Sequence, residues 1–198
     1  MKKTLLITNN YFALNYLLSI LLKYIWKIII TEEYLKIILN NQESLYKVIM
    51  ILNYHNKFRY KIITDISCTD FIIKKKRFEI NYNLLSIDYN SRILISIHCD
   101  KYDSVESLSN LYKGCNWLER ELWDMYGIFF INHIDLRRIL TDYGFDGHPF
   151  RKDFPLNGYI EVRYDENCQY LLYEPLELMQ NIRFYNFNNP LINKKYII

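Results

Sequence analysis

Apolar side chains repeat with two different periods in the first half of the chain. Residues 34–40 and 60–67 each predict a strand, and residues 45–56 between them predict a helix, because their apolar side chains recur at helical spacing. The apolar positions of this helix are Leu45, Val48, Ile49 and Leu52. Asn41 or Ser44 is expected to cap its first turn.

A β-hairpin is the next expected element. Every second residue is apolar in 78–84 and again in 93–99, and residues 88–91 (Asp-Tyr-Asn-Ser) supply turn-forming side chains between the two arms. The resulting order is strand, helix and three strands. It predicts an α+β fold with a mixed or antiparallel sheet and helices on one face.

Residues 104–113 have apolar side chains at helical spacing and precede Gly114, so they predict a second helix. A third helix is expected over residues 116–126. Asn116 is expected as its N-cap, with Glu119 in a capping-box-like position, and Gly127 is expected to end it in the left-handed conformation. Three side chains are expected on its buried stripe: Leu118, Leu122 and Met125.

The third helix also carries several charges. Arg120 and Asp124 are four residues apart and are expected to pair. Glu121 lies at the edge of the apolar stripe, where a buried carboxylate requires a cation or hydrogen-bond donors. The sequence leaves two alternatives open for Glu121: a solvated carboxylate, or a carboxylate paired with Arg137 or Arg138.

Chain-breaking residues are confined to the second half, since all five glycines and all four prolines follow residue 113. We expect one helical turn at 135–140, a strand at 159–164 and no regular structure over 141–157. A loop of that length is usually functional, disordered or laid on a partner. Its aromatic side chains pack either on the chain's own core or on another subunit, and we favour another subunit.

These patterns divide the chain into three parts. Residues 1–33 form an apolar N-terminal segment of uncertain role, 34–131 a globular α+β domain, and 132–198 a long irregular extension that we expect to dock on a partner. Within 14–30, Lys23 and Lys27 interrupt the apolar run, so no membrane span is expected.

Composition narrows the function further. The chain is 51% apolar and 24% charged with a net charge of +3, which is typical of a globular protein. Its only dense basic run, residues 74–77, is short, so we expect no nucleic-acid binding. A nucleic-acid module built on this run would bind with steep salt dependence. Alanine occurs once while Asn, Ile, Lys and Tyr are abundant, a bias that an A/T-rich organellar genome would produce.

No cofactor or metal is expected to bind to this chain. The four cysteines are far apart and form no Cys-x-x-Cys pair.

The alternative to a docking protein is a free-standing acid–base or metal-dependent hydrolase that uses Glu121, Asp124 and His133. No Ser or Cys nucleophile has a recognisable setting, and no Gly-rich phosphate loop is present. The charged groups are more simply explained as a docking surface.

The region around the third helix is specific. Residues 117–127 (WLERELWDMYG) resemble the Glu-Arg-Glu signature of the 30-kDa subunit family of respiratory complex I. Residues 133–145, 147–156 and 158–165 continue the resemblance, and residues 77–86 are also family-like. The resemblance covers roughly residues 45–187 and fades before residue 34.

This resemblance implies an α+β subunit in the matrix arm of NADH:ubiquinone oxidoreductase, on the mitochondrial inner membrane. The subunit would lie in the quinone-reducing module against the 49-kDa subunit, while FMN and the iron–sulfur clusters are carried by other subunits. We therefore expect a non-catalytic, organelle-encoded subunit that supports assembly. The side chains expected at its interface are Glu119, Arg120, Glu121, Asp124, Arg137, Arg138, Asp142, Tyr143, His148, Arg151, Lys152, Asp153 and Phe154.

Overall fold

The structure is a computed structural model that describes residues 16, 19–30, 35–180, 182 and 183. The contacts divide the chain into two compact units, with the division between Pro155 and Leu156. Most of the N-terminal segment, residues 1–15, 17, 18 and 31–33, lies outside the described residues. None of the described helices is long and apolar enough to cross a bilayer.

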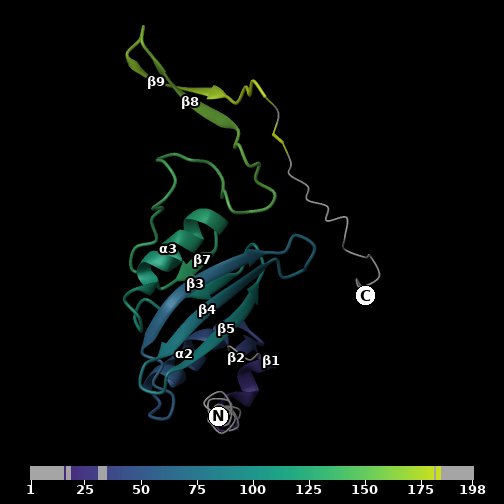
Figure 1. Cartoon of the computed structure of the whole chain (residues 1–198), viewed down its shortest axis with the longest axis vertical. Coiled ribbons are helices and arrows are strands. Elements are labelled where there is room, and N and C mark those ends of the chain that lie inside the picture. Colours follow the sequence, from purple (N-terminus) through teal and green to yellow (C-terminus); the bar gives the residue numbers. More distant parts are fainter. Residues whose placement is uncertain (1–15, 17–18, 31–34, 181, 184–198) are drawn as a thin grey trace, which may run out of the picture. The chain divides into compact units, whose positions relative to one another are not determined.

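A five-stranded mixed sheet forms the centre of the first unit (Figure 1). Its strands are β1 (Ile25–Ile30), β2 (Leu35–Leu39), β3 (Ile62–Asp70), β4 (Phe78–Ser86) and β5 (Ser91–Cys99). Their order across the sheet is β1-β2-β5-β4-β3, and only the β2–β5 pair is parallel. The expected mixed sheet and α+β class are thus confirmed, while β1 is an additional edge strand.

The hairpin of β4 and β5 has the expected register. Phe78 lies opposite Cys99, and the following alternate positions pair in the same way up to Leu84 opposite Ile93. These alternate side chains are buried, whereas the intervening ones of β4 are only partly covered. The period-2 pattern therefore defines the face of the sheet that packs in the core.

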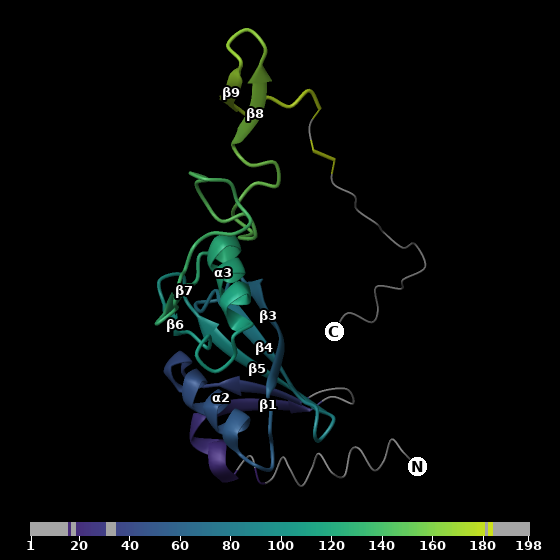
Figure 2. The same cartoon turned by 90° about the vertical axis from the view of Figure 1, so that its left-hand side faces the viewer.

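Two helices cover this same face (Figure 2). The first is α2 (Leu45–Tyr54), which confirms the expected helix, and the second is α3 (Cys115–Tyr126). Side chains of both helices belong to one core cluster with the buried strand residues. Ser44 occupies the N-cap position of α2 without capping it, because its hydroxyl donates to the Asn41 carbonyl 2.6 Å away.

The prediction of a helix over residues 104–113 is wrong. Ser104–Glu106 forms strand β6, which pairs in parallel with β7 (Phe129–Ile131), and turns follow it. Apolar spacing alone did not distinguish a helix from a short strand followed by turns, and the strand partner lies more than twenty residues away. The helical turn expected at 135–140 is also absent from these described residues, which form no helix or strand and bend at 139 and 140.

Helix α3 begins one residue before the expected N-cap and ends at the expected residue. The helix begins at Cys115 with Gly114 at the N-cap, so Asn116 lies inside the helix and caps nothing. Gly127 ends it with φ = +72°, in the left-handed region that glycine adopts readily. This turn directs the chain back along α3 and positions the segment that follows.

The second unit contains an antiparallel hairpin of β8 (Ile160–Asp165) and β9 (Tyr170–Pro175). β8 confirms the strand expected at 159–164, and β9 was not expected. Residues 141–157 contain no helix or strand, as expected.

Candidate subunit-docking site

A buried carboxylate on α3 organises the segment that follows β7. Asp124 is fully buried, and its Oδ2 accepts hydrogen bonds from the backbone N–H groups of Ile139, Leu140 and Thr141 at 3.1, 2.7 and 3.0 Å. The Thr141 hydroxyl donates to Oδ1 at 2.6 Å, and Arg138 Nη1 lies 3.7 Å from the same oxygen. One side chain therefore holds three consecutive backbone groups of a segment without secondary structure.

The hydrogen bonds decide the charge state of this carboxylate. Burial by itself would raise the pKa of Asp124, but the bonds from Thr141, Leu140 and Ile139 outweigh it and lower the pKa below its ordinary value. Asp124 is thus ionised near pH 7 and accepts charge-assisted hydrogen bonds, which are the stronger kind.

A second anchor ties the end of the segment to the β3–β4 hairpin. Arg77 binds Asp70 through two nitrogens, with distances of 2.6 and 2.7 Å, and contacts Asp153 at 2.9 Å. The backbone N–H of Lys152 donates to Asp70 at 2.9 Å. The hydrogen bond from Arg77 lowers the pKa of Asp70, which is 3% exposed. This bidentate pair fixes residues 152 and 153 against the sheet.

A third anchor uses the C-terminal carbonyls of α3, which have no partner within the helix. Arg151 Nε donates to the Tyr126 carbonyl at 2.6 Å, and the Phe150 N–H donates to the Met125 carbonyl at 3.1 Å. His148 Nδ1 lies 2.9 Å from the Asp124 carbonyl and therefore donates to it. Burial lowers the pKa of His148, so its ring is neutral at pH 7.

Glu119 has a different role from the one expected. It is fully buried, and its carboxylate accepts hydrogen bonds from the Ser107 hydroxyl at 2.6 Å and from the Leu108 N–H at 2.7 Å. Its side chain therefore holds the turn after β6 and does not form a capping box. Burial raises the pKa of Glu119 to about 7, against the effect of these two hydrogen bonds. His133 Nε2 lies 3.7 Å from its Oε2.

The expected Arg120–Asp124 pair is not formed. Arg120 Nε donates to the Arg137 carbonyl at 3.0 Å, because Asp124 is occupied by backbone donors and Arg138. The Arg137 side chain contacts Asp135 at 2.8 Å, and Glu121 is half-buried.

The remaining expected interface residues lie in the same segment. Asp142, Tyr143, Lys152 and Asp153 are exposed, and Phe154 is half-buried with its ring centroid 5.9 Å from that of Phe145. The three anchors thus use several of the expected residues, Asp124, Arg138, His148 and Arg151 among them, to shape the chain itself.

Large apolar side chains point outward from this anchored region. Ile134 is 74% exposed, Leu140 59% and Tyr143 fully exposed. Trp117 on α3 is 63% exposed, with the Arg120 guanidinium 4.9 Å from its ring centroid. We call Trp117, Ile134, Leu140 and Tyr143 the outer patch. Backbone and charged groups bind inward and leave these apolar side chains exposed.

The structure gives the hydrolase hypothesis no support. Asp124 is saturated by hydrogen bonds from Thr141 and its neighbours, and His133 lies against Glu119. Among the described residues, no three His, Cys, Asp or Glu side chains are grouped as a metal site requires. Glu121, Asp124 and His133 therefore do not form the expected acid–base site.

Sequence reasoning missed Asp70 and Ser107. The register of β3 and β4 places Asp70 opposite Phe78, which follows Arg77. The pairing of these two strands could therefore have predicted the ion pair between Asp70 and Arg77. Ser107 had none, because its role depends on a turn that the sequence predicted as a helix.

A protein family and several known proteins match this chain over most of its length. The family described as "Respiratory-chain NADH dehydrogenase, 30 Kd subunit" matches residues 38–160. The chain is 47% identical over 150 residues to "NADH dehydrogenase [ubiquinone] iron-sulfur protein 3" of Beta trigyna, covering 76% of this chain and 78% of that protein. It is 50% identical over 147 residues to "NADH-ubiquinone oxidoreductase subunit 9" of Reclinomonas americana, covering 74% and 72%.

The name of the first relative includes an iron–sulfur group, and the cysteines of this chain do not fit one. Cys68, Cys99 and Cys115 are buried and Cys168 is exposed, and among the described residues no three His, Cys, Asp or Glu side chains are grouped as a cluster requires. The matched length and the level of identity show that the chain belongs to the 30-kDa subunit family of respiratory-chain NADH dehydrogenase.

Proposed function

We propose that this chain is a non-catalytic subunit in the peripheral, matrix-side arm of a proton-pumping NADH:ubiquinone oxidoreductase of the mitochondrial inner membrane. It binds neighbouring subunits, chiefly the 49-kDa subunit, and supports assembly and the position of the quinone-reducing module. FMN and the iron–sulfur clusters belong to other subunits, and the chain is encoded in the organelle. Family membership supports the complex, and the anchored segment supports the docking role.

The observation that carries this proposal is the contact of Asp124 with residues 139–141. A segment without secondary structure normally loses conformational entropy when it is ordered. Here Asp124 accepts three backbone hydrogen bonds and so fixes the shape of the segment in advance. A partner then binds a preformed surface at a lower entropic cost.

The outer patch has the composition of an interface. Exposed aromatic and aliphatic side chains grouped on a rigid support are typical of protein–protein contacts, and Trp, Tyr and Arg supply much of the binding energy there. Tyr143 is fully exposed beside the anchored residues, and Arg120 lies over Trp117. These side chains are suited to anchoring a neighbouring subunit.

The hairpin of the second unit supports the same role. Its exposed apolar side chains are Tyr159, Ile160, Val162, Tyr164, Tyr170, Leu171 and Tyr173. A two-stranded hairpin is at best marginally stable alone in water. We therefore propose that β8 and β9 are also stabilised by packing on another subunit.

The test is the double variant Leu140→Ala/Tyr143→Ala in cells whose complex contains this chain. We expect less assembled complex on native gels and unchanged quinone reductase activity per assembled complex. The matched control is Ile87→Ala/Tyr102→Ala, two exposed residues outside the anchored segment, 68% and 88% exposed. Normal assembly of the Leu140/Tyr143 variant would overturn the docking proposal. Normal assembly with lost turnover would indicate a direct role in quinone chemistry.

A further inference from the structure

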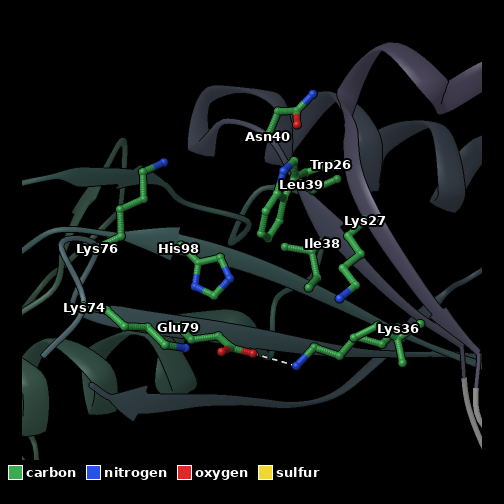
Figure 3. Close-up of a pocket in the computed structure, with 11 residues that line it drawn as sticks. Trp26, Lys27, Lys36, Ile38, Leu39, Asn40, Lys74, Lys76, Glu79 and His98 are labelled. Carbon is green, nitrogen blue, oxygen red and sulfur yellow. Dashed lines mark hydrogen bonds and ion pairs between the residues drawn. The ribbon is translucent and has the colours of Figure 1, made fainter. Parts of the chain in front are cut away.

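The face of the sheet opposite the helices contains a second feature, unrelated to the outer patch. A cavity of about 620 Å³ opens there between β1, β2, β5 and the β3–β4 hairpin (Figure 3). Its apolar lining on this face includes Trp26, Ile29 and Ile38. Ile38 is only 6% exposed, although it does not belong to the core cluster on the helical side.

Lysine side chains surround this apolar lining. Lys27, Lys36, Lys74 and Lys76 line the cavity, and Glu79 is the only carboxylate among the lining residues that the structure describes. Glu79 is bound to Lys36 at 2.6 Å, so it neutralises one lysine and leaves three. Lys27, Lys74 and Lys76 are exposed and come from two different parts of the sheet. The cavity therefore combines an apolar lining with an unbalanced positive rim.

His98 is the remaining ionisable group of the lining, and its pKa responds to the positive charge of the nearby lysines. Burial lowers the pKa of His98, and Lys74, Lys36 and Lys76 lower it further, against the effect of Glu79. The neutral ring stacks edge-on to Trp26, with centroids 6.4 Å apart. His98 thus extends the aromatic lining and adds no charge to the rim near pH 7.

We propose that this cavity binds an acidic peptide segment of a neighbouring protein subunit, in which an apolar side chain is flanked by Asp or Glu. The apolar side chain would lie on Trp26 and Ile38, and its flanking carboxylates would pair with Lys27 and with Lys76. Charge complementarity of this kind mainly provides specificity and association rate.

We take the occupant to be a segment of another chain. Residues 1–15 and 184–198 carry lysines and contain no Asp or Glu, so neither end supplies the carboxylates. A nucleic acid is disfavoured because it requires a long basic surface, whereas this cavity is small and the chain has a net charge of only +3. The inference uses none of residues 119–154, but it rests on the proposed function in that the partner is another subunit of the same complex. A normal assembly of the Leu140/Tyr143 variant would contradict the docking role of the outer patch without changing peptide binding at this cavity.

The first test is a binding titration with the purified full chain. The probe is a short fluorescent peptide in which leucines are flanked by glutamates, and the matched peptide carries glutamine at the glutamate positions. We expect saturable, salt-sensitive binding of the glutamate peptide only. Lys27→Glu/Lys76→Glu should weaken it about tenfold or more. The control Lys47→Glu/Lys113→Glu makes the same charge change at exposed lysines outside the cavity and should have little effect.

Equal weakening by both double variants, or binding of the glutamine peptide alone, would overturn the proposal. So would saturable binding of phosphatidylglycerol vesicles or a single-stranded oligonucleotide at this cavity when the glutamate peptide does not bind.

A second measurement uses the assembled complex, so that the result does not depend on the isolated chain. A photo-crosslinking amino acid in place of Trp26 should label an Asp- or Glu-rich segment of another subunit. Labelling of lipid, or of this chain's own ends, would contradict the proposal.

Discussion

The Thr141 hydroxyl lies 2.6 Å from the buried carboxylate of Asp124, although the two residues are 17 positions apart in the chain. Together with the hydrogen bonds from three backbone N–H groups, this contact satisfies both carboxylate oxygens. Since no solvent reaches Asp124, each donor that loses its acceptor remains unpaired in the protein interior. The anchored segment therefore depends on this one side chain.

We expect Asp124→Asn to lower the free energy of unfolding by about 2–4 kcal/mol. Asparagine keeps the shape, but the charge is lost, and its NH₂ group takes the position of Oδ1, where the Thr141 hydroxyl donates and the Arg138 guanidinium lies 3.7 Å away. Equilibrium denaturation of the full chain measures this effect. Asp146→Asn is the control, because Asp146 is exposed in the same segment. A cost of less than about 0.5 kcal/mol, which is the range for ordinary surface substitutions, would show that Asp124 does not hold the segment.

Glu119 should make stability depend on pH. Its pKa in the folded chain is about 7, above the ordinary value of 4.5. Between these values the folded state keeps the proton that the unfolded state loses, so stability falls as the pH rises from about 4.5 to about 7 and then levels off. The maximum slope from one such group is about 1.4 kcal/mol per pH unit.

The measurement is the difference in unfolding free energy between the unmodified chain and Glu119→Gln across this pH range. We expect the advantage of the unmodified chain to shrink as the pH rises, because glutamine does not titrate. Glu43→Gln, at an exposed position, should show no such trend. A difference that grows with pH would mean that hydrogen bonds or His133 dominate over burial at Glu119.

Gly127 combines two demands that can be separated experimentally. Its φ is +72°, and a Cβ there would overlap the guanidinium of Arg151 and the ring of His148. Gly144 has a similar φ of +76° with open space around it. We expect Gly144→Ala to cost about 1 kcal/mol for the backbone alone, and Gly127→Ala about 2–4 kcal/mol.

Denaturation of both variants gives the comparison. Equal costs for the two glycines would show that Arg151 and His148 move aside freely, and the third anchor of the segment would then be weak.

The β4–β5 hairpin and α2 were predictable because their signals are local. Alternation in 78–84 and 93–99 fixes both the strands and the buried face, and the helical spacing in 45–54 needs no distant partner. Gly127 was predictable for the same reason, since a glycine after a periodic segment is a common helix end.

The site was less predictable because distant partners decide it. Residues 104–106 form a strand only because residues 129–131 pair with them, and the Glu119 carboxylate binds the Leu108 N–H. Similarly, four-residue spacing suggested that Arg120 binds Asp124, but backbone donors from residues 139–141 occupy that carboxylate. Such competition between a local pair and a distant one is not visible in the sequence.

A substitution of Trp117 can distinguish a contribution to stability from a contribution to docking. If its ring belonged to the core, Trp117→Ala would cost about 3–5 kcal/mol. The ring is 63% exposed, so we expect a cost of about 1 kcal/mol or less. Leu122→Ala on the same helix, where the side chain is 3% exposed, should cost about 2–4 kcal/mol.

Assembly of the complex should depend on Trp117 even though the stability of the chain hardly does. Trp117→Ala is expected to reduce the amount of this chain in the assembled complex, because an exposed Trp beneath an Arg is a strong interface anchor. Tyr54→Ala is the matched control: that ring is 67% exposed on α2 and has Lys61 Nζ 5.0 Å from its centroid. If Trp117→Ala and Tyr54→Ala assemble equally well, Trp117 is an ordinary surface residue and the outer patch loses one of its anchors.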